Sequence, residues 1–214
     1  MDSAAKMTTP TVFGVAEDRT IALWTTMAAV GCALGAAWAL ILIPGAAFGR
    51  SPMGPYGPDR VGFSLMPGLG FGVAQVLALR VLFGERIARD HVLPVAWTAV
   101  SLFAMAAMVL PLWLWTAGDL VALPLPAFVP MAPGLLLLGI GQWLLLRKVM
   151  PISAFWAVWT FVGGAFGVPA GLAAAVVWHP ISVDFAWALI VGGCIALPQS
   201  FLLAFVRPEP STTE

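Results

Sequence analysis

The sequence predicts an all-α membrane protein, and composition, run length and backbone chemistry support that class. Of the 214 residues, 61% are hydrophobic and 9% are charged, and the mean hydropathy is +0.97. A water-soluble globule cannot hide so much apolar surface, so a bilayer is the expected environment. Backbone amides in lipid must be bonded within their own segment. Because the sequence lacks the short alternating strands of a membrane barrel, we expect helices.

Six apolar runs are long enough to cross the hydrocarbon, which takes about 20 helical residues. The first run follows a mixed-charge leader without a cleavage signal, so we expect the leader to be retained. The second and fourth runs begin in sequence rich in glycine and proline. The sixth begins at an acidic residue, Asp184. We assign the spans to residues 21–43, 63–84, 93–116, 128–148, 153–178 and 184–206.

Basic residues predict the orientation of these spans. One side holds eight of the ten: Lys6, Arg19, Arg80, Arg86, Arg89, Arg147, Lys148 and Arg207. Only Arg50 and Arg60 fall on the other. Because basic loops stay in the cytoplasm, both termini should be cytoplasmic, with tails at 1–20 and 207–214 flanking a membrane domain at 21–206. The expected location is the cytoplasmic (inner) membrane of a prokaryote.

A repeated phrase predicts three helical hairpins. The chain holds three glutamines and no asparagine, and each glutamine opens a similar segment: Gln75-Val-Leu-Ala-Leu-Arg80, Gln142-Trp-Leu-Leu-Leu-Arg147 and Gln199-Ser-Phe-Leu-Leu-Ala204. Aligning them pairs the spans as first with second, third with fourth and fifth with sixth. The odd spans carry matching pairs, Trp24-Thr25, Trp97-Thr98 and Trp159-Thr160. Repeats of one orientation pack most simply around an axis along the membrane normal, giving a pseudo-threefold bundle.

The glutamines are the candidate site. An amide facing acyl chains without a partner costs several kcal/mol, so Gln75, Gln142 and Gln199 should point inward. There they should bond one another, a backbone carbonyl, or a tryptophan or threonine of a neighbouring helix. Arg80 and Arg147, five residues beyond the first two, can reach the inner head groups. In a second interpretation these arginines and the glutamines bind an anionic head group, a small solute or water.

Small residues and cysteines bear on packing. Glycines four residues apart let helix backbones approach, either within one chain or at a homo-oligomer or partner interface. They are Gly31 and Gly35 in the first span, and Gly163, Gly167 and Gly171 in the fifth. Cys32 and Cys194 lie near mid-membrane, and a closed ring of hairpins would bring the first span beside the sixth. Trp24, Trp97 and Trp178, near span ends, are expected to anchor the interface.

One part of the chain resembles a known group. The segment Gly139-Ile-Gly-Gln-Trp-Leu-Leu-Leu-Arg147, followed by Ala154-Phe-Trp-Ala-Val-Trp159 and Gly163-Gly-Ala-Phe-Gly167, resembles uncharacterised prokaryotic multi-pass membrane proteins with repeated Q-W-L-x-L-R phrases. The resemblance covers about thirty residues and is weaker around Gln75 and Gln199. It implies membrane location and repetition. It transfers no activity and no functional residue.

The remaining polar residues argue against several functions. The acidic residues fall in tails, in loops or, as Asp184 does, at the start of a span. No histidine or base-assisted nucleophile falls inside a span, and His91 and His179 lie at opposite faces. We therefore predict no catalytic residue, no metal site and no cofactor. Scattered basic residues offer no face for nucleic acid. The leading prediction is a non-enzymatic structural or partner-binding component in contact with membrane lipids. The alternative is a small transporter or channel with a pathway past the three glutamines.

Overall fold

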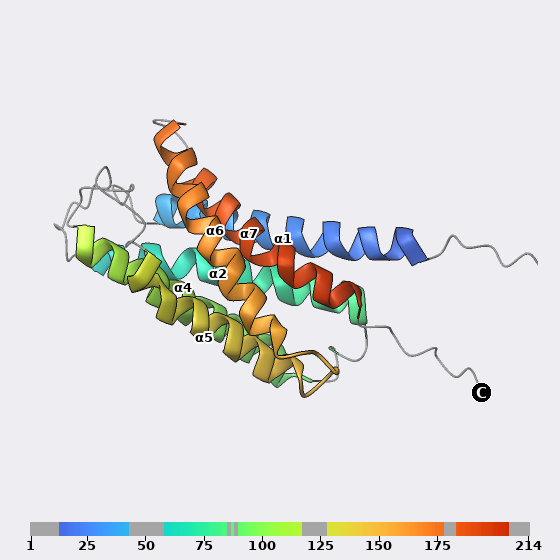
Figure 1. The fold of residues 1–214 in the computed structure, drawn as a ribbon. Helices are drawn as coiled ribbons and strands as arrows, with labels where there is room; N and C mark the ends of the chain where they lie inside the picture. The colour runs from blue at the N-terminus through green and yellow to red at the C-terminus, as the bar shows by residue number, and fades with distance from the viewer. Residues whose placement is uncertain are drawn as a thin grey trace, which may run out of the picture.

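The computed structural model describes residues 13–42, 58–84, 87, 90–116, 128–177 and 183–205. Across these residues the structure has six long helices and no strand, which confirms the all-α class (Figure 1). The helices are α1 (Phe13–Leu42), α2 (Pro58–Phe83), α4 (Val92–Thr116), α5 (Phe128–Leu146), α6 (Phe155–Val177) and α7 (Val183–Ala204).

The helix bounds agree closely with the apolar runs for the last four helices. α1 instead begins at Phe13, so residues 13–20 of the expected N-terminal tail are helical; the rest of that tail and residues 207–214 lie outside the described residues. Three described segments are long and apolar enough to cross a membrane: Asp18–Leu42, Leu65–Phe83 and Phe185–Ala204. Shorter apolar segments occur in α4, α5 and α6.

Local capping residues end or start three helices at the same end of the bundle. Gly84 follows α2 with φ at 52°, a left-handed conformation that glycine adopts without strain. The Asp90 carboxylate accepts the amides of Val92 and Leu93 at 2.9 and 3.0 Å and so caps α4. Ser153 caps α6 in the same way, through the amide of Phe155 at 3.2 Å. These caps fix where each helix enters the bundle.

The six helices form a closed ring. Each packs against its neighbours in chain order, and α1 also packs against α7. The start of α1 and the end of α7 lie at the same end of the molecule, while α6 is steeply inclined (Figure 1). The expected contact between the first and last apolar runs is therefore confirmed. Cys32 and Cys194, both free, face different neighbours, since Cys32 lies against Gly192 and Cys194 against Gly167.

Glycines bring two helix pairs into backbone contact within the chain. A Cβ on Gly31 of α1 would lie 2.5 Å from the carbonyl oxygen of Gly70 in α2, and Gly35 lies against the backbone of Met66. In α6, Gly163 and Gly171 lie against the α7 residues Cys194 and Trp187. The predicted glycine packing thus occurs within one chain, where it leaves no room for side chains.

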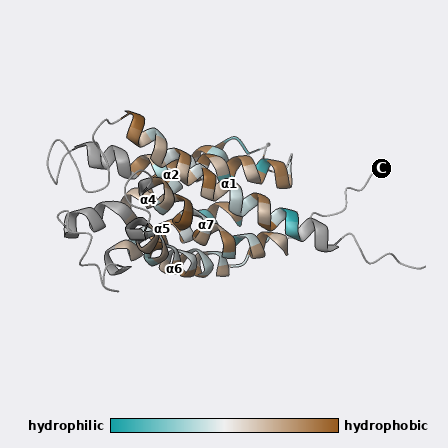
Figure 2. Cartoon of the chain, turned by 90° about the horizontal axis from the view of Figure 1, so that it is seen from above, coloured by the Kyte–Doolittle hydropathy of each residue, from teal (hydrophilic) through white to brown (hydrophobic). Residues whose placement is uncertain are grey.

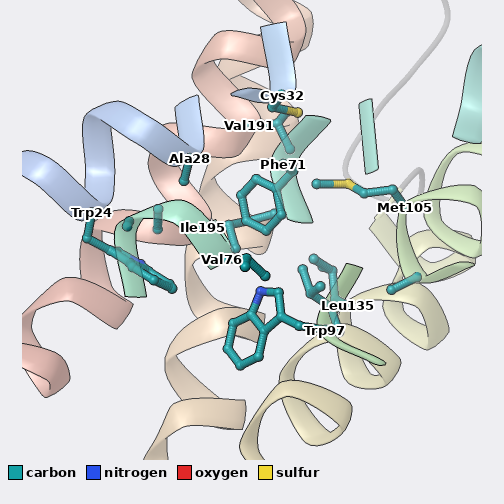
Figure 3. Close-up of a cluster of buried hydrophobic side chains, with 14 of the residues drawn as sticks. Trp24, Ala28, Cys32, Phe71, Val76, Trp97, Met105, Leu135, Val191 and Ile195 are labelled. Carbon is teal, nitrogen blue, oxygen red and sulfur yellow. The ribbon is translucent and has the colours of Figure 1, made fainter. Parts of the chain in front are cut away.

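Large apolar side chains lie both inside and outside this ring. Trp24, Phe71 and Trp97 are fully buried and converge on the core from α1, α2 and α4 (Figure 3). Hydrophobic residues also dominate along the helices as a whole (Figure 2). Val95 and Phe166, for example, are 71% and 73% exposed. Exposed apolar side chains of this size are unusual on a monomeric chain surrounded by water when they form a continuous surface.

Candidate functional site: a buried glutamine cluster

The three glutamines, one each from α2, α5 and α7, meet inside the bundle and form a closed cycle of hydrogen bonds. All three are fully buried. Gln142 Nε2 donates to Gln75 Oε1 at 2.8 Å. Gln75 Nε2 donates to Gln199 Oε1 at 3.1 Å, and Gln199 Nε2 donates to Gln142 Oε1 at 3.1 Å. We refer to these three side chains as the glutamine triangle.

Three buried tryptophans donate hydrogen bonds to the amide oxygens of the glutamine triangle. Each amide oxygen accepts a second hydrogen bond from an indole: Trp97 Nε1 to Gln75 at 3.1 Å, Trp24 Nε1 to Gln199 at 3.4 Å and Trp156 Nε1 to Gln142 at 3.4 Å. Both lone pairs of every amide oxygen are thereby used. The indoles also meet edge to face, with centroids 5.8 to 6.3 Å apart. We refer to them as the tryptophan triangle.

Hydroxyl groups accept a second hydrogen bond from two of the three amide nitrogens. Gln142 Nε2 also donates to Ser101 Oγ at 3.2 Å, and Gln199 Nε2 donates to Thr160 Oγ1 at 2.7 Å. Ser101 and Thr160 each follow a residue of the tryptophan triangle by four positions. The residue four positions after Trp24 is Ala28, which is buried and has no hydroxyl. The amide of Gln75 therefore lacks the acceptor that the other two possess.

Helical geometry explains why a glutamine stands in each run of leucines. Residues four apart share a helix face, so one face of α4 or α6 presents an indole and a hydroxyl together. Residues two apart face different directions. Two positions after each glutamine the side chain is exposed: Leu77, Leu144 and Phe201 are 45%, 41% and 49% exposed. The glutamines occupy the inner face, and their apolar neighbours occupy the outer one.

The inward placement of the glutamines was predicted correctly, including their bonds to one another, to tryptophan and to threonine. Two expectations about tryptophan are wrong. Trp24 and Trp97 are not interfacial anchors, because both are fully buried around the glutamines. Trp178 lies outside the described residues. The third indole is Trp156 and not Trp159, which is 42% exposed on the outer side of α6. A shift of three residues turns a side chain by about 60° around the helix axis, which is enough to move Trp159 out of the core that Trp156 occupies.

The arginines predicted to join the glutamines lie apart from them. Arg80 and Arg147 are both exposed, near the ends of α2 and α5. The Arg147 guanidinium carbon lies 5.2 Å from the ring centroid of Trp143, a cation–π geometry. Ser101 was missed as a site residue. A Trp followed four residues later by Ser or Thr, as in Trp97 to Ser101, is the sequence signal that would have found it.

The cluster is electrically neutral and its groups bond one another, except that the amide of Gln75 lacks one acceptor. It contains amides, indoles and hydroxyls, none of which titrates near neutral pH or supplies a nucleophile with a base. Within the described part of the chain, no group of three or more His, Cys, Asp or Glu side chains is placed to hold a metal ion. The chemistry available here is directional hydrogen bonding between helices.

Fold and site together define a class: an all-helical bundle closed around a buried polar cluster, with an apolar outer surface. Comparison of the chain with protein-family models, with curated proteins and with solved structures finds no match. The resemblance to multi-pass membrane proteins with Q-W-L-x-L-R phrases stays a prediction.

Proposed function

We propose that this chain is an integral protein of a prokaryotic cytoplasmic membrane, in which all six helices cross the bilayer. The observation that carries the proposal is the inverted polarity of the fold. The glutamine triangle is fully buried, whereas side chains such as Val95 and Phe166 point outward. Prolines inside four helices also fit, since they are more frequent in membrane helices than in soluble ones. They are Pro67, Pro133, Pro169 and Pro198.

We propose further that the chain is built from three hairpins, α1 with α2, α4 with α5 and α6 with α7, around an axis along the membrane normal. Support comes from the direction of the hydrogen bonds. Each hairpin supplies one tryptophan and one glutamine, and both donate to the glutamine of the preceding hairpin. The distribution of basic residues favours cytoplasmic termini.

The role we propose is structural or partner-binding and not catalytic. Every amide oxygen of the glutamine triangle already has two donors, so none is free for a solute. A pathway past the glutamines would have to break these bonds and separate the tryptophan triangle. The polar cluster instead suits a rigid core that holds an apolar outer surface for lipids, a second copy of the chain or a membrane-protein partner.

Reconstitution tests this role against the transporter alternative. We expect proteoliposomes containing the chain to retain a panel of entrapped ions, sugars and amino acids as well as protein-free vesicles do. Isolation in native lipid with mass spectrometry should recover a stoichiometric membrane protein or a second copy. Solute flux that disappears when all three glutamines are changed to leucine would overturn the structural role and support the alternative.

A further inference from the structure

A groove between α2 and α4 combines an apolar trough with one charged end. Its volume is about 530 Å³, within the range of small-molecule sites. Val76 and Ala99 contribute to the lining, and exposed Leu77 and Val95 border it. Arg80 is the one charged residue among those that line it. The groove faces outward and so opens, under the proposed membrane embedding, to the surrounding lipid.

Other polar groups near the groove are already engaged. The Thr98 hydroxyl donates to the carbonyl oxygen of Pro94 on its own helix at 2.9 Å. Asp90 accepts the first amides of α4, and no described carboxylate forms an ion pair with Arg80. The exposed guanidinium of Arg80 is thus the polar feature that an occupant of the groove can meet.

The dimensions and the charge match one kind of occupant. Val73 lies seven residues before Arg80 on α2, hence about 10 Å deeper along the helix. A ligand that fits must place an apolar chain over that length and a negative group at its end. Basic residues between membrane helices at the cytoplasmic side recognise anionic head groups in this way.

We infer that the α2–α4 groove binds an anionic phospholipid, with one acyl chain along Val73, Leu77 and Val95 and the phosphate on Arg80. This inference rests on the proposed membrane embedding. It assigns Arg80 a role separate from the glutamine triangle, because Arg80 lies five residues beyond Gln75 on α2. Arg147 likewise lies five residues beyond Gln142, but its guanidinium lies over the ring of Trp143. It provides the matched control.

Lipid titration of the purified, delipidated chain tests the site. Native mass spectrometry would compare phosphatidylglycerol with phosphatidylcholine carrying the same acyl chains. We expect tighter binding of phosphatidylglycerol, an approximately fivefold loss of that binding in Arg80→Gln, and retention in Arg80→Lys and Arg147→Gln. Val95→Trp should fill the groove and weaken both lipids. Soluble glycerophosphate, which lacks acyl chains, should compete poorly.

Several results would overturn the site. They are equal binding of phosphatidylglycerol to wild type and Arg80→Gln, an equal loss in Arg147→Gln, or full competition by glycerophosphate. Thermal unfolding of each variant shows whether it folds, and Arg80→Lys separates charge from packing. Extraction of membranes with alkaline carbonate keeps the two proposals distinct. Release of the chain would refute membrane embedding, whereas retention with unchanged lipid binding in Arg80→Gln would refute only the lipid site.

Discussion

At the scale of single residues, the glutamine triangle answers how an apolar chain tolerates buried amides. Gln142 and Gln199 each take part in four hydrogen bonds, and Gln75 takes part in three. An interhelical bond in a membrane contributes only about 0.6 kcal/mol on average, because unfolded helices in lipid also find partners. Leaving a buried donor unpaired costs more, about 1–3 kcal/mol. Removal of one member should therefore cost more than its own bonds contribute.

Replacing Gln142 with leucine should lower the free energy of unfolding by about 1–3 kcal/mol. The substitution leaves the indole of Trp156 without its acceptor and removes one of the two acceptors of the Gln199 amide, which keeps Thr160. Denaturant unfolding in detergent micelles, followed by tryptophan fluorescence, measures the change. Leu144→Ala is the control, since Leu144 lies two residues away and faces outward. A smaller loss in Gln142→Leu than in the control would count against the cluster.

Replacing Ala28 with serine should stabilise the fold. The serine hydroxyl would give the amide of Gln75 the acceptor that Ser101 and Thr160 give to the other glutamines. We expect a gain of about 0.5–1 kcal/mol, seen as a higher Tm. Ala39→Ser, at another fully buried position of α1, is the control and should bring no gain. Equal shifts in the two variants would contradict the role assigned to position 28.

At the scale of secondary-structure elements, glycine contacts and apolar outer faces decide how the helices pack. Lipid tails compete for apolar surface, so helices in a membrane associate through close backbone contact and polar bonds. α1 and α2 meet at Gly31, Gly35 and Gly70, where an added Cβ would clash with backbone atoms of the opposite helix. Gly193 of α7 differs, because an added Cβ there would meet Ala29 at 3.5 Å, an ordinary contact.

The same substitution should therefore have opposite effects at two glycines. Gly31→Ala forces α1 and α2 apart and should destabilise the bundle by about 1–3 kcal/mol, the usual cost of overpacking. Gly193→Ala fits its site and gains helix propensity of up to about 1 kcal/mol. Thermal unfolding of both variants in one detergent gives the comparison. Similar Tm values for the two would refute the close contact between α1 and α2.

At the scale of the whole molecule, closure of the helix ring between α1 and α7 makes the cluster possible, because Trp24 and Gln199 come from opposite ends of the chain. Helix number and most helix bounds could be predicted from apolar run length alone. The inward direction of the glutamine side chains could be predicted from the cost of leaving a buried amide without a partner. Which tryptophan meets which glutamine could not be predicted, since Trp156 and Trp159 differ by less than one helical turn and only packing distinguishes them.

A designed disulfide tests the closure. In a background with Cys32 and Cys194 changed to alanine, Ala29→Cys combined with Gly193→Cys places two thiols across α1 and α7. The Cβ separation there is 3.5 Å, at the short end of the disulfide range. We expect rapid oxidation and a mobility shift on non-reducing gels. Val30→Cys combined with Gly193→Cys is the control, because Val30 is 42% exposed and lines a second groove, on the outer side between α1 and α2. Equal crosslinking of both pairs would contradict the ring.

The most direct test of the hydrogen-bonded glutamine triangle is a comparison of unfolding free energies for the three single Gln→Leu variants and the triple variant. Each single change breaks two of the three shared bonds, so the single losses count every bond twice. We predict that the triple variant loses less stability than the sum of the single losses, by more than about 1 kcal/mol. A triple loss equal to that sum would show that the three side chains act independently and would contradict the triangle.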